Sequence, residues 1–532
     1  MKLIKYLLFL LILLIECCAS VDKYNAQLNT LRSEKDLKTD VDYIHHKLEK
    51  LHPDLYHYIS KKELDFKFDS LKSTLTSPLT SNDFYFKLSP VIASIKQGHT
   101  QTFPLTKKLK YLEKKSILTN GSSPLALFDF EIFDNKLYIV KNNSKDSTIK
   151  AGTEMLTING VKPMEIITKF SHTFTSDGYN KTFVSRRLAN GFPRFYYYQN
   201  GIVDSVLCQL NYKDTIRTIT LKRPIKLKMA EVKKTMAVVK KPKELVDKDK
   251  ALQKKESQKR KLQGYDPFKR KYSKELRFPT KDSSIAIMKI SDFVKGSYKK
   301  FYKRSFQQLD SVHTKTLIID LRDNPGGRLA EINTLYSHLS DSSFHFIDRA
   351  EVTSKTSLWH FGYFNNEPLW TQAILSVFFP FVIGGDIYTF LKTTKGIDNK
   401  YYFPIKQSKL TLVKANRFKG KVYVLINGGC FSASSVLSSN LKGSKRAVFV
   451  GEETGGADNG CVAGIMPILT LPKSKLTVRF GLMGIQTHYK SMLEGRGIFP
   501  DKEITPILKD RIIGNDPELV WILDIIKGLK RD

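Results

Sequence analysis

Short apolar runs alternate with helical patterns from residue 281 to residue 532, and this alternation constrains the fold more than any other feature of the chain. Buried strands separated by helices form mainly parallel sheets, whose functional groups lie at the strand ends. We therefore expect an α/β domain over residues 281–532. An aromatic-rich insertion at about 351–419 is expected to add extra core or a lid. The apolar runs are Ile285–Ile290, Thr316–Leu321, Lys421–Ile426, Ala447–Val450 and Leu476–Phe480.

Different patterns precede this domain, and a chain of 532 residues is too long for one core. Apolar residues recur every three or four positions in residues 19–105, which predicts a helical N-terminal domain. From 106 to 225 the period changes to two, which predicts a mostly-β domain. Residues 226–280 contain many lysines and few large apolar side chains, so we expect an exposed helical or mobile linker there.

The first residues have the form of an export signal. Two lysines precede an apolar run from Tyr6 to Ile15, which is too short to cross a bilayer comfortably as a helix of about 20 residues. Two cysteines follow, so residues 1–18 are interpreted as a lipoprotein signal with lipid attached to Cys18, or alternatively to Cys17. Glu16 departs from the small residues that usually precede such a cysteine, which leaves secretion as a soluble protein open.

The formal net charge of +35 raises the question of a nucleic-acid partner. The lysines gather in one stretch rather than in a recognised binding motif, which favours a solvated basic surface near anionic lipid or glycan. Beyond the signal only Cys208, Cys430 and Cys461 remain, and they form neither a disulfide framework nor a zinc pattern. The histidines near residue 50 lack the carboxylate or cysteine spacing of a metal site.

A strand that runs into a serine-rich turn is the first candidate for chemistry. The strand Lys421–Ile426 leads into Asn427–Ser435, which contains two glycines and Ser432, and a helical pattern follows. The glycines allow a sharp turn, and the N–H groups of the emerging helix point to where an oxyanion would develop. A serine-rich helix cap explains the same residues without catalysis.

Three further segments supply possible partners for this hydroxyl. Asp320–Gly327 is another strand that ends in a glycine turn, whose N–H groups would complete an oxyanion hole. His99 is the candidate base, although a histidine after glycine is also a common capping residue. Glu494 is the candidate carboxylate that orients and stabilises a charged imidazole; alternatively it is a loop residue paired with Arg496.

These blocks, in the order His99, Asp320–Gly327, Asn427–Thr454 and Glu494–Asp501, resemble the serine peptidase family of tail-specific (C-terminal processing) proteases, tricorn core proteases and interphotoreceptor retinoid-binding protein. The resemblance implies a crotonase/ClpP-like ββα fold for the α/β domain and a PDZ-like fold for the preceding β domain. It also implies that Ser432 attacks. The oxyanion donors it implies are the N–H groups of Ala433 and of Gly326 or Gly327.

Two departures from the family pattern decide the subgroup. The C-terminal processing branch uses a lysine base beyond its serine, and Ala457 stands at that position, so a serine–lysine dyad is not expected. The Gly-His-Thr and Thr-Gly-Gly segments resemble the tricorn-like branch, which has a histidine base. Gly98 replaces the second serine of that branch, so the group that orients His99 stays open.

We therefore expect a serine-type peptidase of the bacterial cell envelope, exported and lipid-anchored, that cleaves peptides or protein tails through Ser432, His99 and Glu494. The resemblance implies no metal and no organic cofactor. The expected partners are a peptide or protein substrate and the membrane, without nucleic acid; the sequence does not indicate an oligomeric state. The alternatives are a non-catalytic family member that binds peptides or hydrophobic ligands, and an anchored scaffold that holds anionic envelope polymers.

Overall fold

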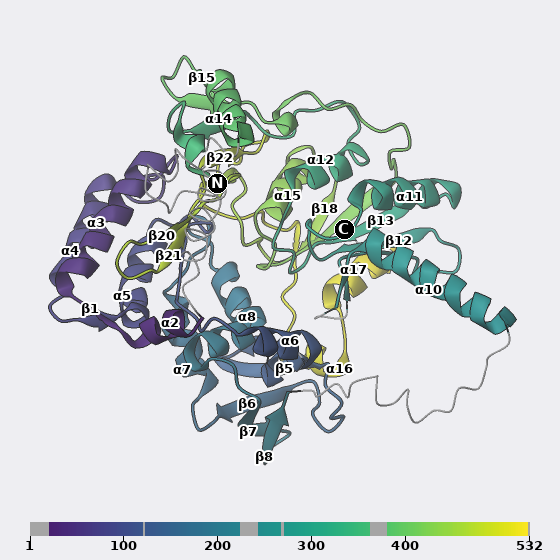
Figure 1. Ribbon diagram of the computed structural model, residues 1–532. Coiled ribbons are helices and arrows are strands. Elements are labelled where there is room, and N and C mark those ends of the chain that lie inside the picture. Colours follow the sequence, from purple (N-terminus) through teal and green to yellow (C-terminus); the bar gives the residue numbers. More distant parts are fainter. Residues whose placement is uncertain (1–20, 121–122, 224–242, 268–270, 362–379, 530–532) are drawn as a thin grey trace, which may run out of the picture.

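The computed structural model describes residues 21–120, 123–223, 243–267, 271–361 and 380–529, so the expected signal segment lies outside the described residues. Figure 1 shows the helical N-terminal region on the left, the antiparallel β domain below it and the α/β domain on the right. Helical, β and α/β parts are all present, so the predicted fold class is confirmed. In the described part of the chain, no helix has both the length and the apolar character that crossing a bilayer requires.

The N-terminal region is built from capped amphipathic helices. Its main helices are α3 (Glu34–Leu51), α4 (Lys61–Ser73) and α5 (Ser81–Ala93), preceded by the short α2 (Val21–Ala26). The residues before the three main helices are Ser33, Ser60 and Thr80, and each side-chain oxygen accepts a backbone N–H of the first helical turn. These caps fix where the helices begin, and α5 ends six residues before His99.

A five-stranded antiparallel sheet forms the β domain, as the period-two pattern predicts. Its strands follow one another in space as they do in the chain, and helices α7 (Pro163–Ser171) and α8 (Thr182–Asn200) connect the third strand to the fourth. Asn159 and Gly160 have positive φ angles in the turn after the third strand, as expected for an Asn-Gly turn. The strands are β4 (Phe128–Phe133), β5 (Lys136–Asn142), β6 (Thr153–Ile158), β7 (Ser205–Tyr212) and β8 (Thr215–Lys222).

The lysine-rich segment is partly a helix and partly a strand of the next domain. Helix α10 (Lys243–Gln263) agrees with the expected helical linker, but β11 (Lys274–Arg277) pairs antiparallel with the first strand of the α/β sheet. The linker is therefore shorter than the expected 226–280. Lys274 is fully buried, and its ammonium group lies 2.9 Å from the equally buried carboxylate of Glu331. A buried lysine needs such a partner, which the local composition does not reveal.

The α/β domain is organised around a six-stranded sheet in the order β11-β12-β13-β17-β18-β23, parallel except for β11. Alternate residues of its strands face two separate cores, one of which is closed by Ile522 of α17 (Pro517–Ile526). On the other face lie α11 (Tyr298–Ser311), α12 (Leu329–Ser337) and α15 (Ala433–Gly443). The strands are β12 (Ile285–Ile290), β13 (Thr316–Asp320), β17 (Lys421–Ile426), β18 (Val448–Gly451) and β23 (Lys502–Glu503).

Of two further sheets, one joins the insertion to the rest of the α/β domain and the other joins the α/β domain to the helical region. The insertion contributes β14 (Ala350–Val352), β15 (Thr394–Lys395), β16 (Tyr401–Phe403) and α14 (Pro380–Lys392), and its strands pair with β22 (Met483–Gln486), which in turn pairs with β19 (Gly460–Ala463). Residues 362–379 of the insertion lie outside the described residues. The predicted run Leu476–Phe480 forms β21 (Thr477–Arg479), which pairs with β20 (Ile468–Thr470) and with β3 (Gln101–Phe103). The β3–β21 pairing carries His99 to the α/β domain.

Candidate active site

Ser432 lies at the strand-to-helix turn that the sequence predicts. It follows β17 and directly precedes α15, with φ +58° and ψ −124°. A positive φ is uncommon for a residue with a Cβ and costs about 1–3 kcal/mol, so it persists only where the surroundings impose it. The turn presents the Ser432 hydroxyl at the N-terminal end of α15, where free N–H groups and the helix dipole favour negative charge.

The His99 ring lies within hydrogen-bonding distance of the Ser432 hydroxyl, although 333 positions separate the two residues in the chain. The Nε2 atom of His99 is 3.0 Å from the Oγ atom of Ser432. Only 5% of His99 is exposed, and its ring packs against that of Phe431 with 4.9 Å between centroids. This distance and this burial satisfy the geometric requirement for a base that takes a hydroxyl proton.

The pKa of His99 is lowered from 6.5 to about 3, chiefly by burial and in smaller part by the positive charges of Arg479 and Arg187. The ring is therefore neutral at physiological pH, as a general base must be. Among the described residues, the Nδ1 atom of His99 has no hydrogen-bond partner. The hydrogen bond that would orient the ring from this side is thus not formed with a protein side chain in the described part of the chain.

The second glycine turn packs directly on the Ser432 turn. The backbone N–H of Phe431 donates to the carbonyl oxygen of Asn324 at 3.0 Å. The Asn324 side chain is fully buried and donates to the carbonyl of Ile290 at 2.8 Å, which anchors the turn to β12. A Cβ on Gly326, whose φ is +96°, would lie 2.7 Å from the Ala433 nitrogen and 2.8 Å from the Ser432 Cβ. Glycine is therefore required at this contact.

The three predicted oxyanion donors are not equivalent. The N–H of Gly326 already donates to the Asn324 side chain at 2.8 Å. The N–H groups of Gly327 and Ala433 have no acceptor within the described residues. Of the predicted donors, Gly327 and Ala433 are thus the pair that is free to bind an oxyanion near Ser432.

Glu494 does not hydrogen-bond His99 in the structure. Its side chain is 59% exposed, and its oxygens lie 3.3 Å from His57 Nε2 and 2.8 Å from the Asn459 amide. The alternative expectation, a pair with Arg496, is wrong because Arg496 makes a bidentate contact with Glu453 at 2.8 and 3.0 Å. Sequence proximity to Arg496 alone does not show which of the two carboxylates, Glu453 or Glu494, pairs with it.

Gly98 lies where the tricorn-like pattern has a serine, and the packing explains the difference. A Cβ at Gly98 would lie 2.6 Å from the ring of Phe431. Sequence reasoning missed the carboxylate that holds this glycine: buried Asp177 accepts the Gly98 N–H at 2.8 Å and the Ala457 N–H at 3.4 Å. Burial raises the pKa of Asp177 to about 6. Nothing in the loop around Asp177 marks it as a partner of the His99 turn.

Several alternative sites are excluded or lie elsewhere. Burial raises the pKa of the thiols of Cys208 and Cys430 to about 12, so neither is a ready nucleophile. His45, Glu49 and Asp65 come close enough to hold a metal ion, but the ammonium group of Lys61 already contacts both carboxylates. Such a pairing satisfies the negative charge without a metal.

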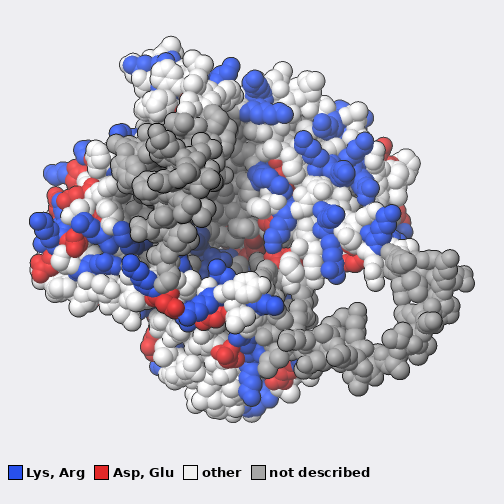
Figure 2. All heavy atoms as spheres, in the orientation of Figure 1, with Lys and Arg blue, Asp and Glu red and all other residues white. Residues whose placement is uncertain are grey.

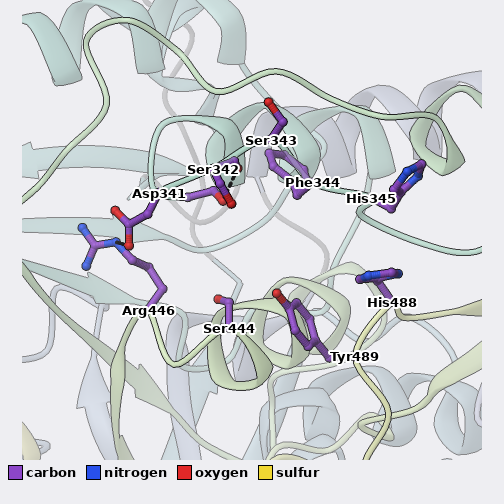
Figure 3. A pocket seen from close by; sticks show the side chains of 10 residues that line it. Asp341, Ser342, Ser343, Phe344, His345, Ser444, Arg446, His488 and Tyr489 are labelled. Carbon is purple, nitrogen blue, oxygen red and sulfur yellow. Dashed lines mark hydrogen bonds and ion pairs between the residues drawn. The ribbon is translucent and has the colours of Figure 1, made fainter.

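A hollow of about 260 Å³ lies away from the predicted site residues. In Figure 3, Asp341 and Arg446 face each other at one end of it and the rings of His345 and His488 lie at the other. The Arg446 guanidinium donates to three backbone carbonyls, which fixes the arginine as a structural residue. The hollow is lined by Ser340, Asp341, Ser342, Ser343, Phe344, His345, Ser444, Arg446, His488 and Tyr489.

Comparisons with known proteins relate this geometry to a family. The model of peptidase family S41 matches residues 284–504. The chain is similar to mature CPAF complexed with lactacystin, with 15% identity and a TM-score of 0.56 over 93% of this chain and 98% of that chain. A second structure of mature CPAF gives 14% identity and a TM-score of 0.55 over 93% and 98%. The photosystem II D1 C-terminal processing protease gives 13% identity and a TM-score of 0.40 over 88% and 93%.

No curated protein matches the chain in sequence. The likeness to the solved structures shows a shared fold, whereas the family model covers the segment that contains Ser432 and both glycine turns. The match of residues 284–504 to the model of peptidase family S41 therefore supports a serine peptidase.

Proposed function

We propose that this chain hydrolyses peptides or protein tails in the bacterial cell envelope, with Ser432 as nucleophile and His99 as general base. The observation that carries the proposal is the 3.0 Å contact between His99 Nε2 and Ser432 Oγ. Ser432 also has a positive φ at the start of a helix, and the neighbouring N–H groups of Gly327 and Ala433 are free in the described structure.

The reaction follows from these positions. His99 takes the Ser432 hydroxyl proton as the oxygen attacks the scissile carbonyl carbon, and the carbonyl oxygen becomes an oxyanion held by the N–H groups of Gly327 and Ala433. His99 then gives the proton to the leaving amine, and an acyl-enzyme remains. Water, activated by His99, hydrolyses the ester and restores the Ser432 hydroxyl. Because Glu494 does not contact the imidazole directly, the proposal assigns proton transfer to Ser432 and His99 alone.

A fluorophosphonate probe tests the proposal, because it reacts only with an activated hydroxyl. We expect labelling to map to Ser432 and to disappear in Ser432→Ala. In His99→Ala the labelling rate is expected to fall by about 10² to 10⁴, the usual contribution of a general base. Ser438→Ala is the matched control, because Ser438 is a buried serine of the same helix α15 whose hydroxyl makes no hydrogen bond in the described structure. A folded protein that is not labelled would favour the non-catalytic, ligand-binding alternative.

The proposed location requires a separate test, since residues 1–20 lie outside the described structure. We infer a lipid anchor at Cys18 from the export-signal pattern. Metabolic labelling with a fatty-acid analogue is expected to mark the wild type and Cys17→Ser but not Cys18→Ser. Labelling lost only in Cys17→Ser would move the anchor by one residue, and an unlabelled wild type would indicate export without an anchor.

A further inference from the structure

Two neighbouring arginines of α8 have very different surroundings. Arg186 contacts two carboxylates, with Glu452 at 2.7 Å and Glu131 at 3.3 Å. Arg187 forms no ion pair with a carboxylate in the described part of the chain. Its guanidinium instead donates to the neutral amide oxygen of Gln101 at 2.9 Å. One arginine of this helix is therefore fully compensated, and the next is a partly buried positive charge without an anion.

A second arginine without an anion lies beside the first. Arg479 of β21 is paired in register with Gln101 of β3, the residue that Arg187 contacts. The Nε–H of Arg479 donates weakly to the carbonyl of His99 at 3.4 Å, and no carboxylate of the described residues pairs with it. The pKa of Arg187 is lowered to about 10, first by burial and then by the positive charges of Arg194 and Arg479. Burial also lowers the pKa of Arg479.

Both guanidinium groups lie next to the predicted catalytic pair. Arg187 packs over the ring of Phe183 at 5.5 Å, and Phe183 stacks on Phe431 with 4.5 Å between centroids. Phe431 precedes Ser432 and contacts the His99 ring. The positive charges of both arginines also reach His99, because each lowers the pKa of its imidazole. Arg187 therefore packs on the apolar wall of the site, and Arg479 lies at the backbone of His99.

Partly buried cations without a counter-ion are unfavourable, and proteins rarely keep them where no anion arrives. The planar guanidinium is also the group that best binds a carboxylate. We propose that Arg187 and Arg479 form a carboxylate-binding subsite beside Ser432, which selects peptides with an Asp or Glu side chain or a free C-terminal carboxylate near the scissile bond. This inference rests on the peptidase function proposed above.

Such a subsite also affects the chemistry. His99 must become an imidazolium when it takes the Ser432 proton, and two adjacent positive charges oppose that step. A substrate carboxylate bound between the arginines would compensate their charge and ease proton transfer. The surface supports attraction of acidic substrates, since lysine and arginine side chains outnumber acidic ones on the face shown in Figure 2, and the whole chain carries +35.

The test uses a chymotryptic peptide mixture from a cell lysate, either untreated or with every carboxyl group converted to its methylamide. Cleavage is followed by mass spectrometry for the wild type, Arg187→Gln, Arg479→Gln and the control Arg217→Gln. Arg217 lies on β8 of the β domain, and its guanidinium donates to the carbonyl of Thr148 at 3.2 Å, so the control removes the same charge at a distance. Fluorophosphonate labelling of the same samples, with a probe that carries no carboxylate, reports Ser432 independently.

We expect the wild type and Arg217→Gln to cleave untreated peptides about tenfold faster or more than methylamidated ones, as befits a charge-assisted contact. The ratio should fall to about one in Arg187→Gln and Arg479→Gln while labelling of Ser432 continues. Cuts at a constant distance from the peptide C-terminus would show that the subsite binds the terminal carboxylate. Cuts beside internal acidic residues would show that it binds an Asp or Glu side chain. If the wild type is labelled at Ser432 but cleaves both mixtures equally, the subsite proposal alone is overturned. If the wild type is not labelled and does not cleave either mixture, the peptidase proposal is overturned as well.

Discussion

The side-chain oxygen of Asn427 accepts the backbone N–H of Asp323 at 2.9 Å, although the two residues are 104 positions apart. The same oxygen accepts the N–H of Gly429 at 2.9 Å. Asn427 is 3% exposed, and it therefore ties the turn that carries Ser432 to the turn that carries the glycine N–H groups. The relative position of nucleophile and oxyanion donors depends on this buried amide.

Asn427→Ala should therefore reduce both stability and activity. It leaves two backbone donors without an acceptor, and each costs about 1–3 kcal/mol when buried. We expect a lower urea midpoint and slower fluorophosphonate labelling of Ser432. Asn143→Ala is the control, because the Asn143 side chain makes an exposed contact with Asp129 at 3.3 Å, and the loss of that contact should leave both measurements nearly unchanged. Equal effects of the two substitutions would contradict the role of Asn427.

Gly326→Ala should displace the nucleophile without removing any functional group. The new methyl group would lie 2.6 Å from the Phe431 carbonyl oxygen and 2.8 Å from the Ser432 Cβ, at a backbone φ of +96°. We expect labelling of Ser432 to fall by at least about tenfold, since a shift of about 1 Å in a reacting group costs up to 10² in rate. Labelling kinetics and thermal unfolding measure the two effects.

The matched control is Gly384→Ala in α14, where an added Cβ meets nothing within 4 Å. Alanine is favoured over glycine in a helix by up to about 1 kcal/mol, so this substitution should leave labelling intact and stability equal or higher. If Gly326→Ala behaved in the same way, the close packing of the two glycine turns would not be important for the site.

Local patterns allowed much of the α/β domain to be predicted. The bounds of β12 and β17 coincide with the predicted apolar runs, because strands buried on both faces are continuously apolar. The last helix, α17, begins at a local signal of the same kind, since the Asp516 carboxylate accepts the N–H of Leu519. The positions of Ser432 and His99 next to each other came from resemblance, because no local pattern relates residues 333 positions apart.

The sequence pattern did not reveal which strands and side chains pair with each other in the folded chain. The run Leu476–Phe480 was predicted as part of the α/β domain, yet it pairs with β3 of the helical region and brings Arg479 to the site. Arg186 and Arg187 are identical in type and adjacent, and only the tertiary structure gives carboxylates to one of them. Asp177 likewise meets Gly98 across 79 positions through a backbone contact that has no side-chain signature.

Arg322 provides a test of the contacts between the sheet and the C-terminal helix. Its guanidinium contacts Asp320 at the end of β13 and makes two 2.8 Å contacts with Asp516 and one of 3.2 Å with Glu518. Arg322→Met removes the ion-pair partner that the structure shows for buried Glu518 and leaves buried Asp320 with Lys289 alone, a loss of about 3–5 kcal/mol. We expect a much lower urea midpoint at neutral pH, and a smaller loss at acid pH where the carboxylates are protonated.

Arg223→Met is the comparison for that measurement, because Arg223 pairs with a single carboxylate, Asp204, which is 82% exposed. A surface pair of this kind contributes at most about 1 kcal/mol. The difference between the two variants therefore isolates the effect of burial, and similar losses would show that the Arg322 cluster is no more important than a surface pair.

The pH dependence of labelling tests whether His99 works in the buried state seen here. The base must be neutral, and its pKa is lowered from 6.5 to about 3, so the neutral form persists in acid. We expect the fluorophosphonate labelling rate to stay within about twofold from pH 8 to pH 5, where a histidine of unshifted pKa would lose roughly thirtyfold. Arg479→Gln removes one cause of the lowered pKa of His99, so the midpoint of the acid decrease in labelling rate should move to higher pH in this variant.

Folding must be followed across the same pH range, because His99 and His52 are both held neutral with lowered pKa values, about 3 and about 4. The unfolded chain binds protons at these histidines near pH 6.5 and the folded chain does not, so stability decreases as the pH falls below 6.5. Circular dichroism at each pH separates this loss from protonation of the base. A midpoint near 6.5 in protein that remains folded would mean that His99 is solvated in the reactive state, and the arginine pair could then not control its charge.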